Sequence, residues 1–266
     1  MLFAANIIRL GGLVTKKITI NAGVNVDLTS VSAFTDLGKL NPIEVTLTGT
    51  FYATNTGDYA FDCGNLSTWT EGVAIIAASG CKFYGKGGAG NSGAGGHAFN
   101  CNSANNSGIL SVWLQSGSIA AGGGGGGKKG SNSNHSHYIK IGSGKTSTCN
   151  GSSSSNGGGG GGGGGRTWIN VSGGAGGSSS GCSTPVNGAS GGTGTSSSAG
   201  GGGTRGTGRY NVSSGSTCPA CQYHYGGNGS SGGSWATAGG GSGGGSAGQS
   251  VANQGSAAYT NNGTVY

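Results

Sequence analysis

Two long runs of glycine constrain this chain more than any other feature. The run at 122–127 has six consecutive glycines, and the run at 157–165 has nine. Glycine has no side chain to bury, and it loses more conformational freedom on folding than any other residue. An ordered structure that contains such runs therefore has to be held together by its backbone N–H and C=O groups.

The overall glycine content has two simpler explanations. The chain has 67 glycines in 266 residues, whereas glycine usually makes up about 7% of a protein. A flexible linker is the simplest interpretation of residues 85–266. Collagen is excluded because it needs a strict Gly-X-Y period and abundant proline, and this chain has 3 prolines and irregular glycine spacing.

The arrangement of the glycines favours an ordered repeat over a linker. Nearly all large side chains beyond residue 84 lie between glycine blocks at 85–96, 117–127, 157–165, 173–181, 191–203, 226–233 and 239–248. Extended threefold helices of glycine can approach so closely that neighbours exchange backbone hydrogen bonds, because no Cβ keeps them apart. We therefore expect a sandwich or bundle of polyglycine II helices connected by irregular loops.

The N-terminal segment, 1–84, follows a different pattern. Apolar residues alternate with polar ones in 16–31, 42–54 and 72–85, which predicts half-buried strands. No segment has a convincing helical period, so we expect little or no α-helix. The prediction is an all-β attachment domain at 1–84, followed by a glycine-rich domain at 85–266 that carries receptor-binding loops. The opening segment 1–15 is expected to form a strand rather than a signal peptide. No apolar run is long enough to cross a bilayer as a helix, so no membrane insertion is expected.

The stretch "KFYGKGGAGNSGAGGHAFN", followed by "ILSVWLQSGSIAAGGGGGG", resembles the glycine-rich adhesin at the tip of the long tail fibres of T-even-like phages. The matching features lie at 83–87, 95–97, 112–114 and 117–127, and the ending "NNGTVY" at 261–266 is also similar. The resemblance implies a sandwich of polyglycine helices whose variable loops bind outer-membrane proteins of the host. Residues 1–80 do not match the family's fibre-attachment segment, which leaves the docking partner open.

The charges point to binding rather than catalysis. All 6 acidic residues lie in the first 71 positions, whereas 9 of the 13 basic residues lie beyond them. The glycine-rich part therefore supplies neither the paired carboxylates of a typical glycosidase nor a Ser-His-Asp triad. We expect no enzyme activity and no cofactor. A basic surface is attracted to anionic ones, such as lipopolysaccharide phosphates or acidic porin loops. Nucleic acid is a weaker candidate, because no typical binding motif is present.

The predicted receptor contacts are aromatic, basic and histidine side chains between the glycine blocks. Tyr, Trp and Arg are enriched at binding hot spots. The predicted set is Lys128, Lys129, His135, His137, Tyr138, Arg205, Arg209, Tyr210, Tyr223, His224, Tyr225 and Trp235. Trp113 and Trp168 are instead expected to cap the ends of the glycine bundle, because each lies close to a glycine block.

The chain has 7 cysteines, and Cys218 and Cys221 have CxxC spacing. A disulfide within this loop, unpaired thiols and a zinc site all remain open. Zinc is the weakest of the three, because there is no second CxxC motif, and no metal site is predicted.

The function predicted from these features is that of a receptor-binding protein at the tip of a phage tail fibre. It would bind an outer-membrane protein or lipopolysaccharide of the host, and would dock to a tail or tail-fibre protein through its N-terminal domain. Its location would be the virion. The alternative is a secreted polyglycine-helix protein with a structural or ice-binding role, which would need more regular repeats, flat faces and a signal peptide.

Overall fold

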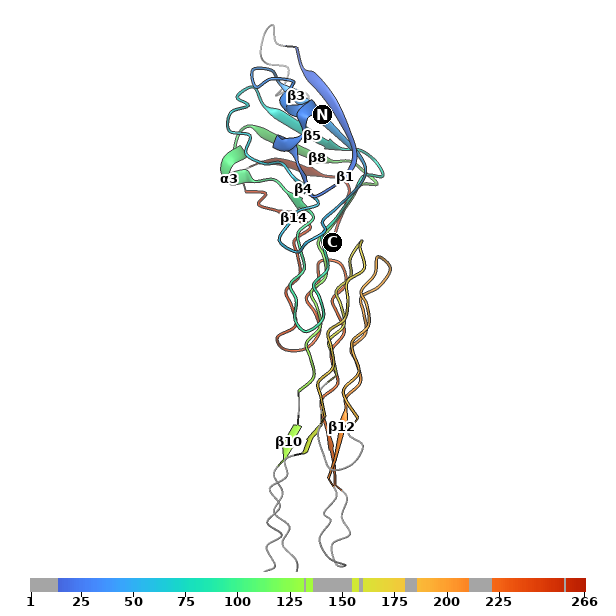
Figure 1. The fold of residues 1–266 in the computed structure, drawn as a ribbon. Helices are drawn as coiled ribbons and strands as arrows, with labels where there is room; N and C mark the ends of the chain where they lie inside the picture. Colours follow the sequence, from blue (N-terminus) through green and yellow to red (C-terminus); the bar gives the residue numbers. More distant parts are fainter. Residues whose placement is uncertain are drawn as a thin grey trace, which may run out of the picture.

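The computed structural model describes residues 14–131, 133–135, 155–157, 160–179, 186–210, 222–255 and 257–266. A body of β-strands lies at one end of the molecule, and a long stem of extended segments runs from it to the opposite end (Figure 1). The body is built around two parallel sheets, and the stem around the glycine blocks. The described chain is therefore almost entirely β or extended.

The first sheet has eight strands, and all of its pairs are parallel. Its order is β15 (Ala258–Asn261), β8 (Leu110–Leu114), β5 (Val73–Ala77), β3 (Ile43–Tyr52), β6 (Lys82–Tyr84), β9 (Ile119–Ala121) and β16 (Thr264–Val265), with β1 (Lys16–Val24) paired to β3. The second sheet is also parallel, in the order β14 (Val251–Ala252), β7 (Phe99–Asn100), β4 (Phe61–Asp62) and β2 (Val26–Asp27).

The chain alternates between these two sheets and thereby forms a parallel β-solenoid. It runs from β1 to β2, from β3 to β4, from β5 and β6 to β7, and from β8 and β9 to β14, and it ends in β15 and β16. We call each such passage a coil. Each coil pairs in parallel only with the coils before and after it, as in other solenoid proteins.

The core lies between the two sheets. Val45, Ile75 and Val112 are in register on successive coils and are all fully buried. Next to them, Phe51 and Phe83 stack with ring centroids 5.3 Å apart. Phe61 and Phe99 of the second sheet stack in the same way at 5.4 Å. The two stacks meet edge to face, which is a favourable geometry for aromatic rings.

A ladder of polar side chains runs along the second sheet beside this core. Asp27, Asp62 and Asn100 are in register on three coils. Asp62 accepts hydrogen bonds from the Gly64 amide and the Asn100 side chain, both at 2.9 Å. Burial raises the pKa of Asp62, its two hydrogen bonds lower it, and the nearby Asp27 raises it further. The ladder therefore holds a carboxyl group that is easier to protonate than usual.

The predicted strands and the scarcity of helix are confirmed. β1, β3, β5 and β6 fall in the three alternating segments within 1–84. The only helical pieces in the described residues are short ones at the corners: η1 (Leu28–Ser30), α2 (Ser32–Thr35) and α3 (Ser103–Asn106). The strand expected at the opening of the chain lies mostly at 1–13, outside the described residues.

The stem leaves the solenoid at one corner, the connection from the first sheet to the second. In the first coil this connection is a single residue, Asn25. It lengthens to 53–60 in the second coil, to 85–98 in the third and to 122–250 in the fourth. The stem, defined here as 85–98 and 122–250, is thus inserted into the solenoid. The strands β7 to β9 and β14 to β16, all beyond residue 84, complete the two sheets.

Hydrogen bonds between the stem segments follow a regular order. Along 123–128, consecutive backbone amides donate to three different neighbouring segments, and the same three segments recur after every three residues. The Gly123 amide donates to the Gly96 carbonyl, and three residues later the Gly126 amide donates to Gly93 in the same neighbouring segment. In the same way, Gly124 and Gly127 donate to Arg166 and Gly163, respectively. Gly125 and Lys128 donate to Thr237 and Gly240, respectively.

The two uninterrupted glycine runs occupy the centre of the stem. Segment 122–127 exchanges backbone bonds with six neighbouring segments, and residues 160–165 of the second run also bond to several surrounding segments. All of these residues are buried. The outer segments, such as 172–179 and 199–206, contain serine, alanine and threonine as well as glycine, and many of their residues are exposed. A residue other than glycine is thus found where a segment has a free side.

Candidate receptor-binding site

The end of the stem opposite the solenoid, here called the distal end, carries two short hairpins (Figure 1). One pairs β10 (Ser133–His135) with β11 (Ser155–Gly157), and the other pairs β12 (Thr207–Tyr210) with β13 (Gln222–Tyr225). β11 lies beside both strands of the second hairpin. The predicted contact residues around His135 and around Tyr223 therefore lie in neighbouring hairpins at one end of the molecule.

The hairpins position the backbone of half of the predicted contact residues. Arg209 lies opposite Tyr223, and the neighbouring pairs place Tyr210, His224 and Tyr225 in the same hairpin. His135 ends β10 in the adjacent hairpin. His137, Tyr138, Cys218 and Cys221 lie outside the described residues, so the roles of the first two and the disulfide of the last two stay predictions.

The predicted basic residues near the hairpins belong to the stem itself. Lys128 continues the central segment, and its amide donates to the Gly240 carbonyl at 3.2 Å. Arg205 precedes β12, and its amide donates to the side chain of Asn228 at 3.0 Å. The side chains of Lys128 and Arg205 are exposed, and that of Lys129 is half-buried. These residues place positive charge along the stem toward its distal end.

Trp235 lies at the other end of the stem, where the stem meets the solenoid. Only 6% of it is exposed, and its ring stacks on Tyr84 with centroids 5.0 Å apart. The Arg166 guanidinium lies over the same indole ring, 5.2 Å from its centre. The structure thus separates Trp235 from the other predicted contacts, because the segment before it runs back toward the solenoid. We therefore leave it out of the proposed site.

The same junction holds an exposed tryptophan that the sequence suggested only as a cap. Trp168 stacks almost parallel on Tyr84, with centroids 4.8 Å apart and planes 4° apart, and 39% of it is exposed. Burial raises the pKa of the Tyr84 hydroxyl, Tyr266 adds to the rise, and Arg166 opposes it. The sequence could not indicate this cluster, because its residues are up to 182 positions apart (84 to 266).

The first coil of the solenoid has an open side. Val45 and Leu47 of β3 are fully buried, but their partners in β1, Ile18 and Ile20, are only half-buried. In the described part of the chain, no strand pairs with the outer edge of β1. Val14, Val24 and Leu40 are also exposed, by 70%, 46% and 74% respectively. An open edge with exposed apolar side chains is suited to pairing with another chain.

The described cysteines belong to the core. Cys63, Cys81 and Cys101 are free and buried. Burial raises the pKa of Cys81 and of Cys101 to about 12 and that of Cys63 well above its usual value, so these thiols are not activated as nucleophiles. Across the ranges that the structure describes, no group of three His, Cys, Asp or Glu side chains could hold a metal ion.

Comparisons with known proteins give one structural likeness. No family model matches the chain, and no curated protein matches it. Among solved structures, the chain is similar to a crystal structure of the gp37–gp38 adhesin tip complex of the bacteriophage S16 long tail fibre. The two are 17% identical with a TM-score of 0.44, and the match covers 94% of this chain and 78% of that one. Within the described residues, no helix is long and apolar enough to cross a membrane.

Proposed function

We propose that this protein is a receptor-binding adhesin at the tip of a phage tail fibre. It binds an outer-membrane protein or lipopolysaccharide of the host through loops at the distal end of the stem. One observation carries the proposal: the two hairpins from which the longest loops start lie side by side, at the end farthest from the solenoid. Loops on a rigid scaffold are where recognition residues are commonly found.

The rigid scaffold in this proposal is a sandwich of polyglycine II helices. The recurrence of bonding partners after every three residues supports it, because a polyproline-type helix has three residues per turn. The burial of 122–127 and of 160–165 supports it as well. Such a lattice uses its backbone groups internally, so side chains in the connections have to provide specificity.

The chemistry of the distal end suits binding rather than catalysis. The chain has no acidic residue after Glu71, so the stem and its loops carry positive charge without neighbouring carboxylates. Such a surface attracts phosphate or carboxylate groups of a bacterial envelope and raises the rate of association. The second hairpin contains Tyr210, Tyr223, Tyr225 and Arg209, and tyrosine and arginine are frequent at binding hot spots. His224 belongs to the same hairpin.

The solenoid end attaches the adhesin to the fibre in this proposal. The open side of the first coil supports this assignment, because it offers an unpaired strand edge and exposed apolar side chains. The partner is a tail-fibre protein, and the location is the virion. The attachment function we assign to 1–84 therefore belongs mainly to its first coil.

The experiment is an exchange of loops between this phage and a relative with another host. Residues 136–154 and 211–221 are replaced together, and adsorption is measured on both hosts. We expect adsorption to follow the loops. A matched control exchanges the turn 196–198, at the solenoid end of the stem, and should leave adsorption unchanged. If a folded loop chimera keeps its original host, the distal end does not read the receptor.

A further inference from the structure

Three aromatic rings form a continuous stack where the stem meets the solenoid. Tyr84 lies between Trp168 and Trp235, at centroid distances of 4.8 and 5.0 Å. The Arg166 guanidinium also contacts the Trp235 ring, 5.2 Å from its centre. The Trp168 side is open, because 39% of this residue is exposed compared with 6% of Trp235. Since Tyr84 covers one face of the Trp168 ring, the exposed part belongs to the opposite face and the ring edge.

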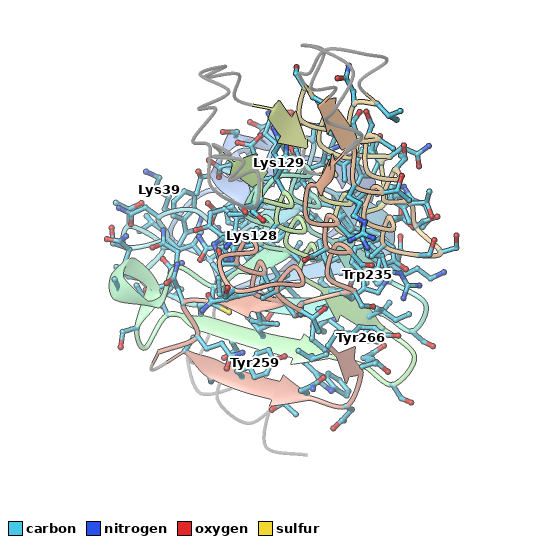
Figure 2. The ribbon with its side chains drawn as sticks, turned by 90° about the horizontal axis from the view of Figure 1, so that it is seen from below. Lys39, Lys128, Lys129, Trp235, Tyr259 and Tyr266 are labelled. Carbon is cyan, nitrogen blue, oxygen red and sulfur yellow. The ribbon has the colours of Figure 1, made fainter. Side chains whose placement is uncertain are left out.

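Other exposed apolar side chains gather around this stack. The described chain has eight large exposed hydrophobic residues, and four of them are at the junction: Trp168, Ile169, Val265 and Tyr266. The Tyr266 amide donates to the Ala120 carbonyl at 3.2 Å, next to the Ala121 that packs against Tyr84. Figure 2, a view from below, shows Trp235 and Tyr266 on the same side of the molecule.

The turn that carries Trp168 is fixed by a cation. The Lys86 ammonium donates to the carbonyl oxygens of Ile169 at 3.2 Å and Asn170 at 3.4 Å. Arg166, two residues before Trp168, donates through Nε to the Ser196 carbonyl at 3.1 Å. The junction therefore holds the Trp168 ring in a preorganised position, on a turn that is bonded to the Lys86 ammonium, and preorganisation lowers the cost of binding.

We propose that this junction is a second binding site, which takes an anionic oligosaccharide. One pyranose ring stacks its C–H face on the free face of Trp168, and Lys86, which bonds to the turn that carries Trp168, attracts a carboxylate or sulfate group of the sugar. A flat ring bordered by polar groups matches a sugar, which has an apolar face and a polar rim. A stable protein partner would need about 800 Å² on each side, more than four partly exposed side chains offer. The site is separate from the distal loops of the proposed function.

The experiment titrates the purified full chain with two oligosaccharides of equal length, a hyaluronan hexamer and neutral chitohexaose. Binding is followed by saturation-transfer NMR and tryptophan fluorescence. We expect both to bind, with the hyaluronan hexamer binding more tightly at low salt. Trp168→Leu should weaken both by up to about tenfold, because it removes the stacking. Lys86→Met should weaken the hyaluronan hexamer more than chitohexaose, by a further factor of about two to five that disappears at high salt, because it removes a charge as well as the two hydrogen bonds to the Trp168 turn.

Two control variants keep the test decisive. Trp168→Tyr retains a flat ring and should retain most of the binding, even if Trp168→Leu disturbs the fold. Arg209→Ala changes the distal hairpin and should leave oligosaccharide binding unchanged, so the two sites can fail independently. The proposal is overturned if neither the hyaluronan hexamer nor chitohexaose binds to the protein. It is also overturned if folded Trp168→Leu binds the oligosaccharides as tightly as the unmodified protein does. If the protein binds a fibre protein through Trp168 and binds no sugar, the junction is a docking surface instead.

Discussion

The amide of Gly127 donates a hydrogen bond to the carbonyl oxygen of Gly163 at 2.8 Å. This bond joins the two longest glycine runs of the chain at the centre of the stem. Residues 122–127 and 160–165 of these runs are surrounded by other segments, so a Cβ at any of these positions would meet a neighbouring backbone. The length of an uninterrupted glycine run thus reflects how completely a segment is enclosed.

The first prediction concerns this enclosure. A Cβ on Gly161 would overlap the Gly174 carbonyl oxygen and lie 2.9 Å from the Gly191 nitrogen, whereas nothing lies within 4 Å of a Cβ on Gly201. We expect Gly161→Ala to lower the free energy of unfolding by about 1–3 kcal/mol or more. Gly201→Ala should change it by about 0.5 kcal/mol or less. Chemical denaturation of both variants measures the difference, and similar midpoints would contradict close packing of the stem.

The second prediction concerns His97, at the point where the chain returns from the stem to the solenoid. Burial lowers the pKa of this imidazole, and its Nδ1 accepts a hydrogen bond from the Gln249 amide at 2.9 Å. Because the pKa is lower in the folded than in the unfolded state, neutral His97 contributes fully to stability above about pH 6.5. That contribution is lost as the pH falls through the folded-state pKa.

We therefore expect the Tm to decrease between about pH 7.5 and about pH 5. In His97→Gln, whose side-chain oxygen can accept the same bond, the decrease should be smaller. Melting curves of both proteins across this range provide the test. The comparison isolates His97 from the chain's other three histidines, which both proteins retain. Parallel pH profiles would exclude His97 as the cause.

The third prediction concerns Asp62 in the polar ladder. Its pKa is raised chiefly by burial, so the folded state binds this proton more tightly than the unfolded state does. The ionised group consequently costs stability, and this cost appears as the pH rises through the acid range. Asp62→Asn retains an acceptor for Gly64, and we expect it to raise the Tm at pH 7 by about 2 °C.

This gain should vanish near pH 3, where the carboxyl group is itself neutral. Asp62→Ala is the control, because it removes the acceptor for both Gly64 and Asn100. Loss of one hydrogen bond costs about 1 kcal/mol, so this variant should melt lower than the unmodified protein at every pH. A gain for Asp62→Asn that persists at pH 3 would point to a cause other than ionisation.

The fourth prediction concerns attachment to the fibre. Leu40 is 74% exposed in the connection from the first coil to the second, so Leu40→Glu should leave the Tm nearly unchanged, within the small range typical of surface changes. If the fibre protein covers this region, the buried charge should weaken attachment by at least about tenfold. Val186→Glu is a matched control on the stem, where the valine is 58% exposed. Equal attachment of both variants would place the docking surface elsewhere.

Much of the fold could be predicted from local patterns in the sequence. The alternation in 42–54 predicts β3, and the glycine blocks predict a stem of regular segments. The solenoid could not be predicted, because its coils are completed by strands far apart in the sequence. β7 precedes most of the stem and β14 follows all of it, yet the two strands pair. A periodic pattern within one segment of the sequence cannot predict a pairing between strands so far apart.

The candidate site shows the same limit. The clusters at His135 and at Tyr223 were visible in the sequence as aromatic and basic residues between glycine blocks. The position of Trp235 at the solenoid end of the stem could not be predicted, because the residues next to it in the sequence resemble those of the predicted binding loops. Only the direction of the segment before it, which runs back to the solenoid, places it against Tyr84.

The insertion of the stem into the solenoid also sets an order of events during biosynthesis. The first three coils can form as soon as β7 has been made, but the fourth and fifth need β14, β15 and β16, which come after the whole stem. A chain with a misfolded stem leaves the edges of β8 and β9 unpaired, because β15 and β16 cannot reach them. The two sheets are thus completed only after the stem has been made, and a chain with a defective stem keeps an exposed, aggregation-prone strand edge.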